Sequence, residues 1–98
     1  MEIRIEHGEA MRVVAKGRLD TVTSVDFDNA LKKETITENK VIVDFTDVEY
    51  ISSAGLRVLL ALKRDLDAQG KELEIHNVNA VVREVFTVTG FINALTVQ

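Results

Sequence analysis

Cysteine, proline and tryptophan are absent from this chain of 98 residues, and aromatic residues make up only 5% of it. Without cysteine the chain can form neither a disulfide framework nor a thiolate metal site, which fits a reducing cytoplasm. The single tyrosine and the four phenylalanines are scattered along the sequence. They offer no platform on which the bases of a nucleic acid would stack.

A basic surface and a long apolar segment are missing as well. The formal net charge is -4, whereas nonspecific binding to nucleic acid requires lysine and arginine side chains that neutralise phosphates. No uncharged apolar run approaches the ~20 residues of a membrane-spanning helix. Residues 1–5 lack the basic start and apolar core of a signal peptide. We therefore expect a cytoplasmic protein without direct nucleic-acid contacts and without membrane insertion.

The remaining composition is ordinary for a globular protein, with 46% hydrophobic and 29% charged residues. This length predicts a single domain over residues 1–98. A domain of this size leaves little volume for a deep enclosed active site.

Alternating side chains predict two strands near the N-terminus. Residues 1–6 alternate between apolar and charged, and in residues 11–19 the neighbours of Val14 face opposite to it. The turn of residues 7–9 joins the two strands as a hairpin. Gly17 in the second strand indicates a bulge or a close backbone approach.

A change to helical spacing predicts a first helix over about residues 23–33. Phe27 and Leu31 fall on one face of such a helix. Thr23 and Asp26 resemble a capping box at its start.

A strand and a second helix follow. The β-branched run of residues 41–45 is typical of a central strand covered on both faces, and we expect a loop over residues 46–51. Ser52 and Ser53 are both competent N-caps for a helix that reaches Gln69. The glycine after Gln69 suits the left-handed conformation that ends many helices.

The last third of the chain predicts a strand over residues 71–76 and a third helix. Asn77 or Asn79 caps that helix and Gly90 closes it, while residues 91–97 form a short helix or an edge strand. The order is therefore β-β-α-β-α-β-α. With right-handed crossovers this order predicts an α/β fold: a small mixed sheet of four to five strands with three to four helices.

The junction at Ser52 and Ser53 is the most informative position in the sequence. Free backbone N–H groups and the positive end of the helix dipole favour an anion there. A phosphate on Ser53 would add about -1.5 to -2 charges and disrupt an interface built around a neutral serine. On these residues alone, simple helix capping is the more frequent role of such serines. Gly55 costs about 1 kcal/mol of helix stability relative to alanine, which indicates a close approach of another chain or of another element of the domain.

Apolar residues cover more of the second helix than one core-facing stripe requires. Two interpretations stay open: an exposed patch beside Ser53 that docks a partner, or burial on both sides by neighbouring elements. The residues concerned are Leu56, Val58, Leu59, Leu60 and Leu62.

No pattern points to catalysis, a metal or a cofactor. His7 and His76 stand alone, without metal-ligand spacing. A nucleophilic serine needs a base that no motif supplies here, and Ser-Ser-Ala-Gly is not the Gly-x-Ser-x-Gly turn of hydrolases. No phosphate-cradling glycine loop indicates nucleotide binding. We therefore predict that the protein is not an enzyme.

Three segments together resemble the STAS domain, the family of sulfate-transporter and anti-sigma-antagonist domains. They are Gly17-Arg18-Leu19-Asp20, the run from Tyr50 to Leu60 that reads Tyr-Ile-Ser-Ser-Ala-Gly-Leu-Arg-Val-Leu-Leu, and the helix from Val82 to Phe91 with its Gly-hydrophobic stop. The resemblance covers essentially the whole chain.

In bacterial antagonists of this family the motif reads Asp-Ser-Ser/Thr-Gly, and its first serine is phosphorylated. Laid on this chain, Ser52 stands at the Asp position, Ser53 at the phosphoserine, Ala54 at the following Ser/Thr and Gly55 at the glycine. The resemblance implies that Ser53 is the phosphoacceptor. The partner-binding candidates that it implies are Asp20, Ser52, Ala54, Gly55, Leu56 and Arg57. From the residues alone, Asp20 equally well starts the turn into the first helix.

The implied function is that of an anti-sigma factor antagonist. Its unphosphorylated form would bind an anti-sigma factor that is a GHKL-type serine kinase and so release a sigma factor. Phosphorylation of Ser53 would end the complex, and a PP2C-type phosphatase would reset it. The alternative is a constitutive STAS scaffold or regulatory subunit of a transporter or signalling complex, whose binding does not depend on phosphate at Ser53.

Overall fold

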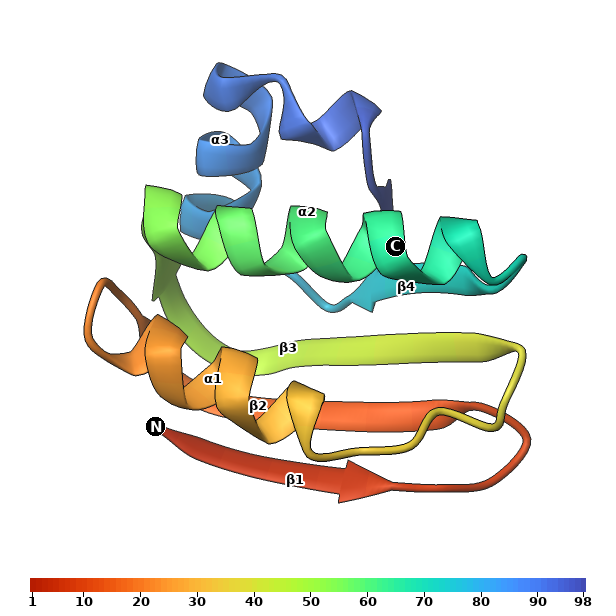
Figure 1. Cartoon of the computed structure of the whole chain (residues 1–98). Coiled ribbons are helices and arrows are strands. Elements are labelled where there is room, and N and C mark those ends of the chain that lie inside the picture. The colour runs from red at the N-terminus through yellow and green to blue at the C-terminus, as the bar shows by residue number, and fades with distance from the viewer.

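Five strands form one sheet in the order β1-β2-β3-β4-β5 in the computed structural model, which describes residues 1–98 (Figure 1). The strands are Glu2–Glu6 (β1), Met11–Leu19 (β2), Lys40–Ile51 (β3), Glu72–His76 (β4) and Thr96–Val97 (β5). The helices are Thr23–Lys32 (α1), Ser53–Ala68 (α2) and Ala80–Thr89 (α3), followed by the short 3₁₀ helix Phe91–Asn93. β1 and β2 are antiparallel, and each later strand pairs in parallel with the one before it. The predicted fold class and element order are confirmed.

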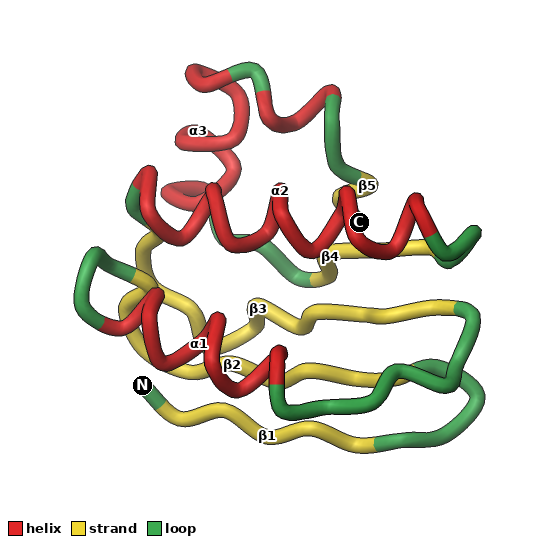
Figure 2. The backbone as a smooth tube through the Cα atoms, viewed as in Figure 1, coloured by secondary structure: helices red, strands yellow, loops and turns green.

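The helices α1 and α2 lie side by side over one face of the sheet (Figures 1 and 2). Each crossover leads to the next strand in the same direction, so right-handed connections bring their helices to the same side. The other face has no helix over it. Val41, Val43 and Phe45 are buried, but Ile42 and Asp44, which alternate with them, are only half-buried. The prediction that this strand is covered on both faces is therefore wrong.

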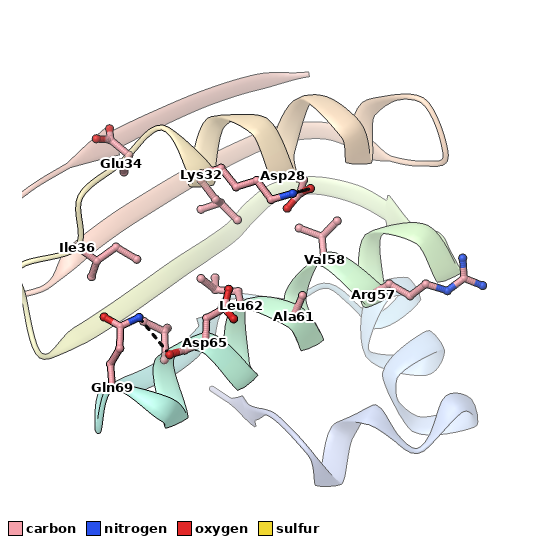
Figure 3. Close-up of a pocket in the computed structure, with 12 residues that line it drawn as sticks. Asp28, Lys32, Glu34, Ile36, Arg57, Val58, Ala61, Leu62, Asp65 and Gln69 are labelled. Atoms are coloured by element: carbon pink, nitrogen blue, oxygen red, sulfur yellow. Dashed lines mark hydrogen bonds and ion pairs between the residues drawn. The ribbon is translucent and has the colours of Figure 1, made fainter.

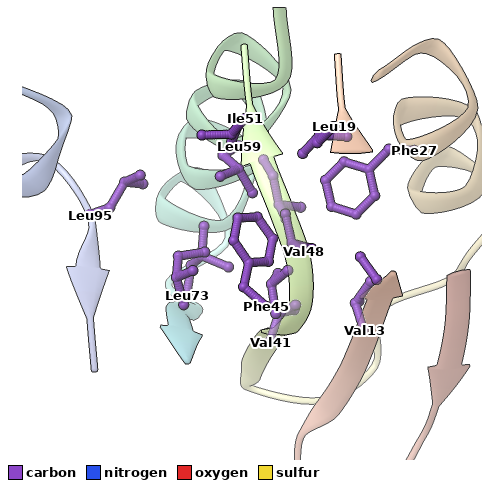
Figure 4. Packing of buried hydrophobic residues seen from close by; sticks show 14 of the residues in the cluster. Val13, Leu19, Phe27, Val41, Phe45, Val48, Ile51, Leu59, Leu73 and Leu95 are labelled. Atoms are coloured by element: carbon purple, nitrogen blue, oxygen red, sulfur yellow. The ribbon is translucent and has the colours of Figure 1, made fainter. Parts of the chain in front are cut away.

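A single cluster of 20 buried hydrophobic residues fills the space between the sheet and the helices (Figure 4). Three phenylalanines anchor it, each fully buried: Phe27 from α1, Phe45 from β3 and Phe86 from α3. Helices and sheet therefore share one core.

β3 continues to Ile51, so the loop expected over residues 46–51 is part of the strand. Val48 and Ile51 are buried, and Ile51 pairs with Leu19 of β2. The register between β2 and β3 shifts twice, once between Val14 and Lys16 and once between Gly17 and Arg18, and each time β3 contains one residue more than β2. Gly17 has a φ of 111°. Of the two interpretations of Gly17, a bulge is therefore present next to it, with the additional residue on β3.

The capping box of α1 differs from the predicted pair. Asp20 Oδ1 accepts the N–H groups of Val22 and Thr23 at 3.0 Å each, and the N–H of Asp20 donates to Thr23 Oγ1 at 2.9 Å. The reciprocal partners are therefore Asp20 and Thr23, while Asp26 lies in the first turn without a capping role.

The other predicted helix ends are confirmed. Ser52 caps α2, and Asn79 caps α3 by accepting the N–H of Val82 at 2.8 Å. Gly70 and Gly90 adopt left-handed conformations, with φ values of 70° and 79°.

His7 and Glu38 connect the turn between β1 and β2 to the segment between α1 and β3. Their Nδ1 and Oε2 atoms lie 2.8 Å apart, and Glu34 Oε2 is 3.5 Å from His7 Nε2. The hydrogen bond with Glu38 raises the pKa of His7 above its usual value, against a smaller opposing effect of desolvation. Burial alone would raise the pKa of Glu38, but hydrogen bonds from its own N–H, from His7 and from Gly8 lower it instead.

We expect the protein to lose stability as the pH rises through the folded-state pKa of His7. A raised pKa means that the charged pair contributes fully below the unfolded value of about 6.5 and is lost at higher pH. Urea unfolding at pH 6.0 and 8.5 should show a larger drop for the wild type than for His7→Gln. Equal drops for the two proteins would contradict this role of His7.

Candidate functional site

Ser53 lies at the end of the sheet where β2 and β3 finish and α1 and α2 begin (Figure 1). The N–H of Ser52 donates to the carbonyl oxygen of Leu19 at 2.8 Å. This bond joins the start of α2 to the end of β2. It brings Asp20, which follows Leu19, and Ser53 to the same end of the molecule. This neighbourhood was expected only from the resemblance to the STAS family.

The two adjacent serines have different roles. Ser52 is the N-cap of α2, with an extended backbone, and its hydroxyl accepts the N–H of Gly55 at 3.4 Å. Ser53 is the first helical residue; it is exposed, and its hydroxyl forms no hydrogen bond within the chain. The capping role that competed for Ser53 therefore belongs to Ser52, and the Ser53 hydroxyl has no hydrogen-bond partner within the chain.

Gly55 is packed tightly against the rest of the domain. A Cβ at this position would lie 2.8 Å from Leu19 Cγ and 2.9 Å from Ile51 Cγ1. The close approach that the sequence indicated is thus to the ends of β2 and β3. Leu56 is only 1% exposed. Gly55 and Leu56 consequently fix the first turn of α2 through their contacts with the interior of the domain. Ala54 is half-buried and Arg57 is exposed.

The apolar residues of α2 face mainly into the domain. Leu56, Leu59 and Leu62 are buried, while Val58 and Leu60 are half-buried. Of the two interpretations left open by the sequence, burial by neighbouring elements therefore describes these residues.

Exposed apolar side chains occur elsewhere at this end of the molecule. Val22 is 76% exposed and Val25 57% exposed, both at the start of α1, and Val81 in the first turn of α3 is 55% exposed. Sequence reasoning missed them. Val25 precedes the buried Phe27 by two residues and therefore lies on another side of the helix. This spacing in the sequence could have indicated that Val25 is exposed.

Asp20 serves the start of α1. The hydrogen bond from the Thr23 N–H is the largest effect that lowers the pKa of Asp20, with further bonds from the Thr23 hydroxyl and the Val22 N–H. Its carboxylate is thus held ionised beside Ser53. The turn-starting role is present in the structure, and a contact with a partner stays a prediction.

Asp44 and His76 are examples of titratable side chains that lie in ion pairs within the sheet. Burial alone would raise the pKa of Asp44, but hydrogen bonds from Thr46, Asn77 and Arg12 outweigh it and lower the pKa to about 2. His76 Nε2 lies 2.9 Å from Glu74 Oε1. No three His, Cys, Asp or Glu side chains are grouped so that they could hold a metal ion. None of the helices has the length and apolarity needed to cross a membrane.

We predict that Gly55→Ala changes the free energy of unfolding by between zero and a loss of about 2 kcal/mol. Overpacking against Leu19 and Ile51 costs about 1–3 kcal/mol, and the better helix propensity of alanine returns about 1 kcal/mol of it. Urea unfolding measures the change. Gly8→Ala is the control, because its Cβ would meet only the Ala10 carbonyl oxygen, at 3.9 Å. A Gly55→Ala protein about 1 kcal/mol more stable than the wild type, as helix propensity alone predicts, would rule out this packing.

Alanine substitutions should also distinguish the structural roles of Ser52 and Ser53 by their effects on stability. Ser52→Ala removes the N-cap and should cost about 0.5–2 kcal/mol of stability. Ser53→Ala removes a hydroxyl without partners and should change stability by less than about 0.5 kcal/mol. Thermal and urea unfolding of both variants provide the test. If the Ser53 variant lost as much stability as the Ser52 variant, the assignment of cap and free hydroxyl would be incorrect.

Several known proteins with a similar sequence or fold are STAS domains or anti-sigma factor antagonists. Residues 4–96 match the family model described as "Mlab, STAS domain". BtrV of Bordetella bronchiseptica, which bears the name of an anti-sigma factor antagonist, is 40% identical over 60 residues, which are 61% of this chain. The chain spans about half of BtrV, 52% of its length.

Two further relatives align over nearly the whole chain. The anti-sigma-B factor antagonist of Listeria monocytogenes is 23% identical over 99 residues, covering 100% of this chain and 87% of the relative. The crystal structure of an anti-sigma factor antagonist from Mycobacterium paratuberculosis superposes with a TM-score of 0.87 at 20% identity, over 98% of this chain and 83% of that one. At this identity the structural likeness establishes the fold. The family match over residues 4–96, the five-stranded sheet and the serine pair at the start of α2 together show that this chain belongs to the STAS domain family.

Proposed function

We propose that this protein is an anti-sigma factor antagonist that acts in the bacterial cytoplasm and is switched by phosphorylation of Ser53. Its unphosphorylated surface binds an anti-sigma factor that is a GHKL-type serine kinase, and the sigma factor is released. Phosphorylation ends this complex, and a PP2C-type phosphatase restores it. The observation that carries the proposal is the exposed Ser53 hydroxyl, without any hydrogen bond, on the first turn of a helix that its neighbour Ser52 already caps.

A phosphate on Ser53 is compatible with the fold. The N–H groups of a helix's first turn and the helix dipole stabilise an anion at this position. The first turn of α2 contains no acidic residue, so the phosphate meets no like charge on its own helix. The modification therefore alters the surface and leaves the core unchanged.

The same phosphate is unfavourable for an apolar interface. Val22 and Val25 are exposed at the start of α1, which Asp20 caps. A partner that covers these valines excludes water from the surroundings of Ser53. A phosphate on Ser53 adds about -1.5 to -2 charges. Binding of the partner would then remove these charges from water, and the ionised Asp20 at the same end of the molecule would repel them. This cost dissociates the partner.

A binding role is also supported by the positions of the two histidines. His7 is paired with Glu38 and His76 with Glu74, and neither forms a hydrogen bond with Ser53. A nucleophilic serine needs a base within hydrogen-bond reach. Ser53 accordingly accepts a phosphoryl group from the kinase and performs no catalysis itself.

A constitutive STAS scaffold or regulatory subunit is the second candidate. It is favoured by Ser52 and Ala54, which stand where antagonists of the family carry Asp and Ser/Thr. In that case binding to the partner would not respond to charge at Ser53.

We expect Ser53→Ala to bind the kinase with wild-type affinity and Ser53→Asp to bind at least tenfold more weakly. Isothermal titration calorimetry with the purified kinase measures both affinities. Thr35→Asp is the matched control, since this exposed residue lies beyond the other end of α1. Incubation with kinase and ATP should add one phosphoryl group to the wild type and none to Ser53→Ala, as read by mass spectrometry. Equal affinities for the Ala and Asp variants would refute the switch and favour the scaffold.

A further inference from the structure

A groove of about 430 Å³ lies between α1 and α2 (Figure 3). The helices run parallel, since each leads back over the sheet between parallel strands. The apolar part of the lining comes from both helices and from the segment after α1. It consists of Leu31, Ile36, Val58, Ala61, Leu62 and Leu66. Ala61 is exposed, and its small side chain leaves the middle of the groove open.

The charges along the groove are only partly neutralised within the chain. Lys32 Nζ and Asp28 Oδ2 form an ion pair at 2.8 Å. Arg57 and Asp65 on α2 also line the groove, and neither forms an ion pair. The pKa of Lys32 is raised mainly by Asp28, and the charge of Asp65 contributes to the same effect. Arg57 and Asp65 are eight residues apart, which is about 12 Å along a helix. The groove thus presents an apolar lining with the unpaired Arg57 towards one end and the Asp65 carboxylate, partly balanced by Lys32, towards the other.

We propose that this groove binds an amphipathic helix of the same protein partner that covers Ser53. The helix would place apolar side chains over Ala61, an acidic side chain near Arg57 and a basic side chain near Asp65. An apolar helix face in a hydrophobic groove is a recurrent mode of recognition, and the two opposite charges fix its direction. The inference rests on the proposed function for the identity of the partner.

The charge pattern alone does not select the occupant, because α1 of a second copy, together with its C-cap, also carries exposed Asp26 and Lys33 seven residues apart, beside the exposed Val22 and Val25. The position of the groove selects it, since Arg57 lines the groove and lies four residues after Ser53 on α2. A helix from the partner that covers Ser53 is therefore the occupant to which we commit.

The groove is adjacent to the phosphorylation site through Arg57. Ser53 and Arg57 are four residues apart on α2, a spacing at which helical side chains meet. A phosphate on Ser53 can therefore take the Arg57 guanidinium as its own charged partner. Arg57 is then no longer available to the acidic residue of the bound helix. Phosphorylation would weaken the groove contact in addition to its direct effect at Ser53.

A synthetic peptide tests the groove without the kinase. The probe is a helical 14-residue peptide with a leucine stripe flanked by one glutamate and one lysine two turns apart, and the control peptide has lysine at both positions. Heteronuclear NMR of the labelled protein should show shifts at Val58, Ala61 and Leu62 with the first peptide, and at least fivefold weaker binding of the control. Shifts confined to other surfaces, or no shifts, would overturn the proposal.

Filling the groove tests its use by the kinase. Ala61→Trp should weaken kinase binding at least tenfold, while Ala68→Trp, at the exposed end of the same helix, should change it less than twofold. Circular dichroism verifies that both variants are folded, and Arg57→Glu is a second probe that leaves the groove's shape intact. Equal kinase affinities for the two tryptophan variants would exclude the groove. If the wild type itself does not bind the kinase, the proposed function fails, and the peptide experiment still decides the groove.

A double-mutant comparison tests the link through Arg57. Ser53→Asp should weaken peptide binding in the wild-type background and have a smaller effect when Arg57 is alanine. An effect of Ser53→Asp that is the same in both backgrounds would show that Arg57 does not connect the two sites.

Discussion

The contact between the first turn of α2 and the ends of β2 and β3 fixes the site. Gly55 permits it, because any side chain would collide with Leu19 and Ile51. The hydrogen bond from the Ser52 N–H to the Leu19 carbonyl oxygen holds the same turn from its other side. Ser53 is thereby placed beside the start of α1, on a rigid helix terminus. A functional serine on a mobile loop would lack both the fixed position and the helix dipole.

The direction of the crossovers determines which face of the sheet carries the helices and the candidate binding surfaces. Since the two crossovers from β2 to β3 and from β3 to β4 lie on the same side of the sheet, α1 and α2 share one face and leave a groove between them. The opposite face carries ion pairs such as Arg12 with Asp44. The exposed Ser53 and the apolar groove both lie in the helical layer.

Adjacent serines separate the cap of α2 from the proposed site of modification. Ser52 supplies the cap, while the Ser53 hydroxyl is exposed and forms no hydrogen bond within the chain. A chain in which one serine served both purposes would lose a cap whenever it was phosphorylated. Under the proposed function, a phosphate on Ser53 would therefore act on the partner interface, through desolvation and through competition for Arg57.

The sequence by itself determined the features that depend on short-range interactions. The order of strands and helices, a cap at Ser52 or Ser53, a cap at Asn77 or Asn79 and the left-handed glycines at Gly70 and Gly90 all follow from neighbouring residues. The structure then assigned the caps to Ser52 and Asn79. The motif in residues 50–60 is sufficient to single out Ser53. These features involve backbone groups and side chains only a few positions apart.

Only the tertiary structure decided which surfaces are covered. It extended β3 to Ile51 through pairing with β2, left one sheet face open and gave the reciprocal cap of α1 to Asp20 and Thr23. It also buried Leu56 and exposed Val22. The physical reason is that burial and strand pairing depend on residues distant in the chain, and the periodicity of one segment does not reveal what lies against it.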